Sequence, residues 1–187
     1  MNILRGIFEI ATGRAQGLER FGSSPRDFLI SLYVLMAVPV LSALVMVMRR
    51  GVGSALAILL LLACALLAPA VISHFVARQW GREELWLRFA TAFNWSRFAI
   101  VSVFAVMLAI TAVLIGLGVS RDSAAEFLVM AVSFYSLWLE WFLARNALRL
   151  SGGRAVLMVL AMNIGTFLLL AMPGQIMRFL GGGVSLD

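Results

Sequence analysis

The chain has 187 residues, of which 63% are apolar and 13% are charged, and its formal net charge is +6. About a quarter of the residues of a soluble domain are charged, so this composition excludes a water-exposed surface over most of the chain and indicates lipid as solvent. All fifteen basic residues are arginines, which is typical of a GC-rich genome and points to a bacterial source. No arginine-rich block or aromatic–basic repeat supports nucleic-acid binding.

Residues 1–24 form a polar segment, and apolar residues recur in it at helical spacing over 2–21. This pattern predicts an amphipathic helix that lies on the cytoplasmic surface of a membrane. The segment lacks the continuous apolar stretch of a signal peptide, so we expect no cleavage. The apolar positions are Ile3, Leu4, Ile7, Phe8, Ala11, Ala15, Leu18 and Phe21.

Five long apolar stretches follow within residues 25–178. About 20 residues of helix cross the hydrocarbon layer, and open strands would leave backbone groups unpaired there. We therefore predict an all-α integral membrane bundle of about five transmembrane helices. The segment 78–97, which alternates aromatic and charged residues, is predicted to lie along the interface before the third span. The predicted spans are 27–48, 53–77, 97–119, 124–146 and 154–176, with a short tail at 179–187.

The arginines of the short connections predict the orientation. Four lie on one side of the predicted bundle: Arg49, Arg50, Arg121 and Arg178. Eleven lie on the other side: Arg5, Arg14, Arg20, Arg26, Arg78, Arg82, Arg88, Arg97, Arg145, Arg149 and Arg154. The positive-inside rule then places the N-terminus in the cytoplasm and the C-terminus outside, in the inner (plasma) membrane of a bacterium.

Polar residues inside the spans form a candidate intramembrane site. Glu140 shares a helix face with Ser133 and Ser136. A carboxyl group there relays protons or binds a cation in a transporter, or it is hydrogen-bonded, protonated or paired with an arginine and holds helices together. Asn163 is interpreted first as a packing residue. His74 is interpreted as an interfacial histidine, because a single histidine without a second ligand makes a poor metal site.

Arginines and tryptophans near the span ends form a candidate lipid or partner contact. Trp138, Trp141 and Arg145 lie on one face of the fourth span, which is typical either of anchoring in the aromatic belt or of contact with headgroup phosphates. The full candidate set is Arg82, Arg88, Arg97, Trp138, Trp141, Arg145 and Arg149.

The sequence contains no serine-hydrolase elbow, P-loop, zinc-protease motif or dinucleotide fingerprint. We therefore expect no enzyme activity, no catalytic residues, no cofactor and no metal site.

The layout resembles the Yip domain family in three respects. About five spans follow a polar N-terminal segment. The connection Phe75–Glu84 contains a glycine and leads into a helix start of small and aromatic residues at 89–93. Residues 138–150, followed by Gly152-Gly153-Arg154-Ala155, are similar to the family's last hairpin. The resemblance implies a non-enzymatic multispan protein, and eukaryotic members of the family work in vesicle trafficking, membrane shaping and recruitment of small GTPases.

Two functional hypotheses follow. The first is a non-catalytic inner-membrane scaffold or adaptor whose cytoplasmic arginine- and tryptophan-rich face engages anionic lipid headgroups, another membrane protein or a second copy of the chain. The alternative is a small oligomeric transporter or channel subunit that uses Glu140, since five spans enclose too narrow an interior for a pore in one copy.

Overall fold

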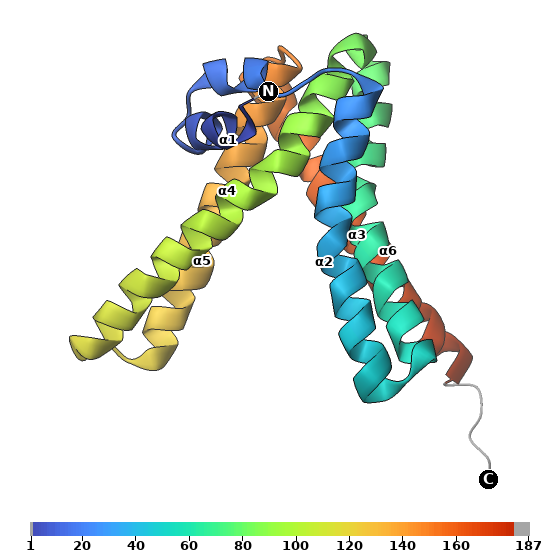
Figure 1. Ribbon diagram of the computed structural model, residues 1–187, viewed down its shortest axis with the longest axis vertical. Helices are drawn as coiled ribbons and strands as arrows, with labels where there is room; N and C mark the ends of the chain where they lie inside the picture. The colour runs from blue at the N-terminus through green and yellow to red at the C-terminus, as the bar shows by residue number, and fades with distance from the viewer. Residues whose placement is uncertain (1, 182–187) are drawn as a thin grey trace. The chain divides into compact units, whose positions relative to one another are not determined.

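The computed structural model describes residues 2–181, and for residues 50 and 172–181 it describes the backbone alone. The described part is all-α, as predicted (Figure 1). Five of the helices are long and apolar enough to cross a membrane, so the chain is a multi-pass membrane protein. The elements are α1 (Ile3–Ala11), the 3-10 helix η1 (Ala15–Arg20), α2 (Pro25–Arg50), α3 (Val52–Gln79), α4 (Glu83–Gly116), α5 (Arg121–Ala147) and α6 (Gly152–Gly181).

The chain divides into two compact units, and helices α2 and α6 contribute residues to both. The first unit contains the described residues up to Ser31 together with Glu84–Val159. The second contains Leu32–Glu83 and the described residues from Leu160 onward.

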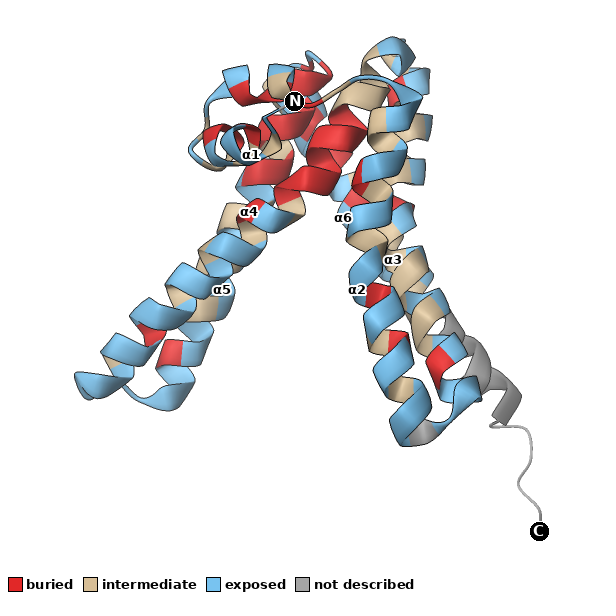
Figure 2. Ribbon diagram, viewed as in Figure 1, coloured by how far each residue is buried: buried red, intermediate tan, exposed pale blue. Residues whose placement is uncertain are grey.

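The core of the first unit is formed around α4. Every residue from Phe89 to Ser96 is buried, so this stretch of helix is covered by protein on all sides (Figure 2). The other fully buried side chains of this unit include Leu139 and Leu143 of α5 and Met158 of α6. Small residues between the aromatic ones allow neighbouring helices to approach α4 closely.

This burial corrects the prediction for residues 89–96 of the segment 78–97. An interfacial helix leaves one face in water, whereas Phe89, Phe93 and Trp95 are all buried. Helix α4 is also continuous from Glu83, so the third membrane-crossing helix starts well before residue 97. Aromatic residues suit both a headgroup belt and a protein core, which is why the pattern alone was misleading.

Beyond this core, α4 and α5 continue as an antiparallel hairpin that closes at residues 117–120 (Figure 1). Its side chains are largely apolar and exposed, which is the surface expected for helices in contact with lipid. The strongly exposed positions include Val101, Val106, Val113, Leu117, Val129 and Phe134.

The N-terminal segment is not one helix over residues 2–21. Helix α1 ends at Ala11, and the hydroxyl of Thr12 donates to the carbonyl oxygens of Phe8 and Glu9 at 3.1 and 3.0 Å. Gly13 then adopts a φ of 76°, a conformation that a glycine reaches without the steric cost of a Cβ. The chain therefore reverses at Gly13, and η1 folds back against α1.

The reversal changes what the apolar face of this segment contacts. Ile10, Leu18 and Phe21 are buried inside the first unit. Leu4 and Phe8 remain 81% and 64% exposed, and they are one helical turn apart. The apolar surface that the segment offers to a membrane is thus narrower than predicted.

In the second unit, α3 and α6 pack closely where Gly165 faces Ile72. A Cβ at Gly165 would come within 2.6 Å of the Ile72 Cδ1 atom, so the glycine lets the Ile72 side chain lie directly against the α6 backbone. Beside it lies an apolar cavity of about 240 Å³, whose lining includes Cys64 and Val71. Helix α6 continues to Gly181, which makes residues 179–181 of the predicted tail helical, and residues 182–187 lie outside the described residues.

Candidate functional site

A polar cavity of about 260 Å³ lies in the first unit, between η1, the beginning of α4 and the end of α5. It brings together Arg88 and Arg149, two residues of the predicted lipid-contact set that are distant in the sequence. Its full lining is Ala15, Gln16, Leu18, Glu19, Arg88, Asn146, Ala147 and Arg149.

Arg149 has an unusual backbone conformation. It directly follows the C-cap residue of α5, and the N–H of Leu150 donates to the carbonyl of Arg145 at 3.1 Å, which closes the helix end. The φ of Arg149 is 51°, the left-handed conformation for which helix ends usually select glycine. An arginine in this conformation costs on the order of 1 kcal/mol, and such strain is a signal of function. The buried side chains of Leu148 and Leu150 hold the turn in place.

The guanidinium groups of the two cavity arginines are free to bind an anion. Within the described part of the chain, neither Arg88 nor Arg149 makes a side-chain hydrogen bond or an ion pair. Two guanidinium groups beside one cavity attract an anion, and their planar forks match the oxygen atoms of a phosphate or carboxylate. The amide of Asn146 is held by a 2.7 Å hydrogen bond from its Nδ2 to the carbonyl of Phe142.

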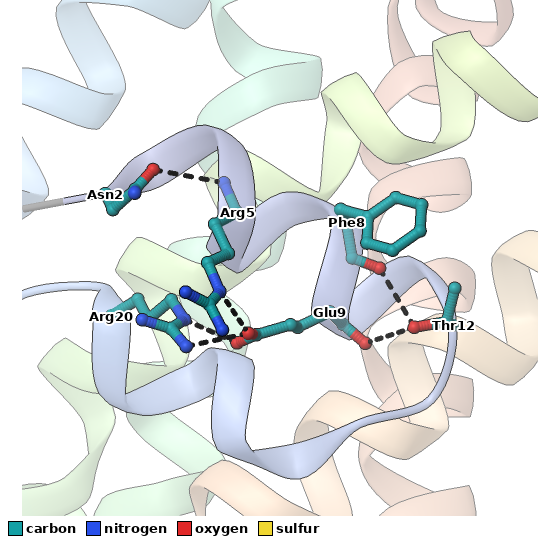
Figure 3. Close-up of polar contacts among 6 residues, drawn as sticks. All are labelled: Asn2, Arg5, Phe8, Glu9, Thr12 and Arg20. Carbon is teal, nitrogen blue, oxygen red and sulfur yellow. Dashed lines mark hydrogen bonds and ion pairs between the residues drawn. The ribbon is translucent and has the colours of Figure 1, made fainter.

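Glu9 fixes the position of η1, which supplies Gln16 and Glu19 to the cavity. Its carboxylate accepts hydrogen bonds from Arg20, at 2.5 Å from Nε and 2.7 Å from Nη2, and from Arg5 at 3.0 Å (Figure 3). The hydrogen bonds from Arg20 hold the pKa of Glu9 below its ordinary value. The Glu9 side chain is 8% exposed, so this ion pair stands inside the folded segment.

Gly17 lets η1 approach α1 closely. A Cβ on Gly17 would lie 2.8 Å from the carbonyl oxygen of Gly6 and 2.9 Å from the Cβ of Glu9. Sequence reasoning missed both this contact and the Glu9–Arg20 pair, because it placed these residues on one continuous helix. The glycine at position 13 was the available signal for a turn.

The N-terminal segment is docked on α5. The hydroxyl of Tyr135 donates to the carbonyl oxygen of Ala11 at 3.1 Å. The ring of Trp138 lies so close to Gly13 that a Cβ there would come within 3.2 Å of it, and it stacks on Phe142 with ring centroids 5.6 Å apart. Trp138, predicted to contact lipid or a partner, therefore contributes part of its surface to an internal contact.

Trp141 and Arg145 join the end of α5 to the start of α6. The indole N–H of Trp141 donates to the carbonyl oxygen of Gly152 at 3.2 Å. The guanidinium carbon of Arg145 lies 5.2 Å from the centroid of the Trp141 ring, within cation–π range. Arg82, by contrast, belongs to the second unit and is not part of the cavity lining.

Arg97 is half-buried and interacts with Glu140, which is buried. Its guanidinium carbon lies 4.6 Å from the centroid of the Phe93 ring, and it interacts electrostatically with Glu140, which is 6% exposed. This placement supports the hypothesis that Glu140 is paired with an arginine between helices and does not support Arg97 as a headgroup contact. The predicted serines do not surround Glu140: Ser133 is exposed, and the Ser136 hydroxyl donates to the Val132 carbonyl of its own helix.

A buried hydrogen bond that the sequence analysis did not predict links α4 to α2. The side-chain amide of Asn94 donates to the hydroxyl of Ser31 at 2.9 Å. The Ser31 hydroxyl in turn donates to the carbonyl of Phe28 at 2.7 Å. A polar residue within the aromatic stretch 89–96 was the only signal for it.

The remaining predicted residues, His74 and Asn163, belong to the second unit. The Nε2 atom of His74 lies 3.8 Å from a carboxylate oxygen of Glu83, and the Nε of Arg78 lies 4.0 Å from the other. These contacts connect the end of α3 to the beginning of α4. Asn163 is exposed on α6.

The fold and this cavity define an all-α multi-pass membrane protein with two unpaired arginines at the end of one helical unit. Comparisons of the chain with models of known protein families, with curated proteins and with solved structures find no match. The resemblance to the Yip domain family stays a prediction from the sequence.

Proposed function

We propose that the chain is a non-catalytic scaffold of the bacterial inner membrane, of Yip-like type, which binds anionic lipid headgroups at its cytoplasmic face. The observation that carries this proposal is the cavity that Arg88 and Arg149 both line, where neither arginine makes an ion pair with any of the described residues. Arginine forks bind phosphate oxygens through paired charge-assisted hydrogen bonds.

The location of these residues along their helices supports a lipid ligand. Arg88 lies near the beginning of α4 and Arg149 directly after the end of α5. Since the two helices form an antiparallel hairpin, these ends lie on the same side of the membrane, and arginine counting makes that side cytoplasmic. Each arginine near an anionic leaflet contributes about 1 kcal/mol to the association.

The stacked Trp141–Arg145 pair and the exposed Leu4–Phe8 pair support the same location. Tryptophan and arginine side chains favour the headgroup level, and a short amphipathic helix inserts its apolar residues just below it. The cavity would then open where lipid phosphates lie.

Lipid retention in nanodiscs tests the proposal. The purified protein is placed in phosphatidylcholine nanodiscs with a fraction of phosphatidic acid and phosphatidylglycerol, and the lipids bound to it are measured by native mass spectrometry. We expect Arg88→Gln with Arg149→Gln to weaken anionic lipid binding roughly 30-fold, from about 1 kcal/mol per arginine. Arg121→Gln, at the predicted outer end of α5, is the matched control. Unchanged anionic lipid binding in the double variant would contradict the proposal.

The burial of Glu140 supports a second candidate function, a small oligomeric transporter or channel subunit. An ionisable residue inside a membrane span marks ion or proton pathways in many transporters. Its test is ion or proton flux into proteoliposomes, which Glu140→Gln would abolish. The electrostatic interaction with Arg97 favours a structural role for Glu140, in which the carboxylate holds helices together. In that case Glu140→Gln lowers the stability of the protein, and the wild-type protein carries no flux.

A further inference from the structure

The chemistry of the cavity at Arg88 and Arg149 distinguishes between classes of phosphate ligand. Its lining combines two unpaired guanidinium groups with the side chains of Gln16 and Asn146, while Glu19 contributes the only carboxylate. A larger depression of about 800 Å³ shares Gln16 and Glu19, but the arginine in its lining, Arg20, is already bound to Glu9. The smaller cavity is therefore the one with guanidinium groups free for an anion.

We infer that this cavity selects a lipid whose headgroup is a phosphomonoester, as in phosphatidic acid, over lipids with phosphodiester headgroups. The inference rests on the proposed function and names the ligand class of the same site.

The number of acceptor oxygens favours a phosphomonoester. Each arginine presents a fork of N–H donors, and two bidentate forks on a phosphodiester must share both of its non-bridging oxygens, so each oxygen accepts from both arginines. A phosphomonoester has three such oxygens and carries up to two negative charges. Two bidentate forks on a phosphomonoester therefore share one oxygen instead of two, which relieves the crowding of the two guanidinium groups.

The charge of the residues near the cavity also favours a phosphomonoester. Arg20 and Arg5 share the carboxylate of Glu9, and Glu19 interacts electrostatically with Arg20. These four groups balance one another in formal charge. Arg88 and Arg149 are the two arginines of the cavity lining and make no ion pair among the described residues, so a dianionic phosphomonoester neutralises both of them and a monoanionic diester neutralises one.

The strained conformation of Arg149 indicates that its guanidinium fork is needed at the cavity. Glycine would remove the strain at this helix end without disturbing the backbone hydrogen bonds that close it. An arginine in that position is explained if its fork is required at the cavity. If the site needed only a positive charge, a flexible lysine elsewhere on the turn would supply that charge without the strained backbone.

The inference predicts a pH dependence that originates in the ligand. The second ionisation of a phosphomonoester has a pKa of about 6, and the groups around the cavity are carboxylates and guanidinium groups, which do not ordinarily titrate between pH 5 and 8. The one histidine, His74, belongs to the second unit. The charged residues on α1, on η1 with its N-cap, on the first two turns of α4 and from the last turn of α5 to Arg149 are Arg5, Glu9, Arg14, Glu19, Arg20, Glu83, Glu84, Arg88, Arg145 and Arg149.

The experiment compares phosphatidylcholine nanodiscs that contain equal fractions of either phosphatidic acid or phosphatidylglycerol, at pH 5 and at pH 8. We expect the full-length protein to bind phosphatidic acid about tenfold more tightly than phosphatidylglycerol at pH 8, and about equally at pH 5. Arg149→Lys keeps the charge and should remove most of this preference. Glu19→Gln removes the opposing carboxylate and should strengthen binding of phosphatidic acid.

Equal binding of the two lipids at pH 8, with both lost in the Arg88→Gln and Arg149→Gln variant, would overturn the monoester selectivity and leave the proposed function standing. Loss of neither lipid in that variant would overturn both. Glycerol 3-phosphate and inorganic phosphate serve as soluble competitors. If either displaces phosphatidic acid at a concentration equal to that of the lipid, the lipid is not the natural source of the phosphomonoester, and that part of the inference fails.

Discussion

The side-chain amide of Asn94 donates a hydrogen bond to the hydroxyl of Ser31 at 2.9 Å, and the two residues are 3% and 1% exposed. The bond joins α4 to α2 inside the core of the first unit. Hydrogen bonds between membrane helices contribute about 0.6–1.7 kcal/mol each. We therefore expect Asn94→Ala to lower the free energy of unfolding by about 1 kcal/mol, plus the loss of packing around the removed atoms.

A double-mutant cycle with Ser31→Ala, followed by SDS-induced unfolding, isolates this bond from the packing effect. The expected coupling energy is about 0.6–1.7 kcal/mol. Strictly additive effects of the two substitutions would mean that the bond contributes nothing to stability.

The Glu9–Arg20 pair predicts that the N-terminal segment detaches in acid. Because the pKa of Glu9 is lowered in the folded state, the pair stabilises the fold fully above the ordinary carboxyl value of 4.5 and loses this contribution as the pH falls below it. The protection factors for hydrogen exchange of residues 3–20, taken relative to the unfolded chain at the same pH, should therefore be high at neutral pH and fall below that value. In Glu9→Gln the protection factors should already be low at pH 7 and change little with pH. A wild-type profile in this variant would show that the pair does not hold the segment.

Gly17 predicts a steric test of how η1 is packed. Gly17→Val forces a side chain against the Gly6 carbonyl and should destabilise the N-terminal segment by about 1–3 kcal/mol. Faster protease cleavage near residues 12–20 would report the effect. Gly53→Ala is the control, because a Cβ there meets no atom within 4 Å and the substitution should be neutral or mildly stabilising. Equal protease resistance of Gly17→Val and wild type would contradict the close contact.

Arg149→Gly separates stability from lipid binding. Glycine relieves the left-handed strain, so thermal unfolding of the detergent-solubilised protein should shift upward, corresponding to about 1 kcal/mol. Binding of phosphatidic acid should fall about fivefold, from about 1 kcal/mol for the lost arginine. Arg149→Ala keeps the strain and loses the charge, and should therefore bind as weakly without the gain in stability. A less stable Arg149→Gly variant would show that the arginine serves the fold.

The five spans were predictable because a long apolar stretch with few or no charges has one stable structure in lipid, the α-helix. The break at Gly13 was not, because the apolar spacing of Ile10, Leu18 and Phe21 fits a continuous helix as well as a folded-back one. The burial of residues 89–96 was also missed, since aromatic residues beside arginines occur both at interfaces and in cores.

Much of the candidate site depends on contacts between distant parts of the chain. Arg88 and Arg149 could each be selected as interfacial arginines, but their common cavity requires the antiparallel packing of α4 and α5 and the fold of η1. An arginine partner was one of the possibilities predicted for the Glu140 carboxylate. Helical spacing alone could not identify Arg97 as that partner, because the two residues lie on different helices.

The central claim is that the cavity lies at the cytoplasmic surface of a membrane that the chain crosses five times. Single-cysteine labelling tests it directly, with Cys64 first replaced by alanine. Val119→Cys reports on the turn between α4 and α5, and Ser151→Cys on the turn between α5 and α6. A membrane-impermeant maleimide should label Val119→Cys in intact spheroplasts and Ser151→Cys only after permeabilisation. Labelling of Ser151→Cys in intact spheroplasts would place the arginines outside and contradict the account.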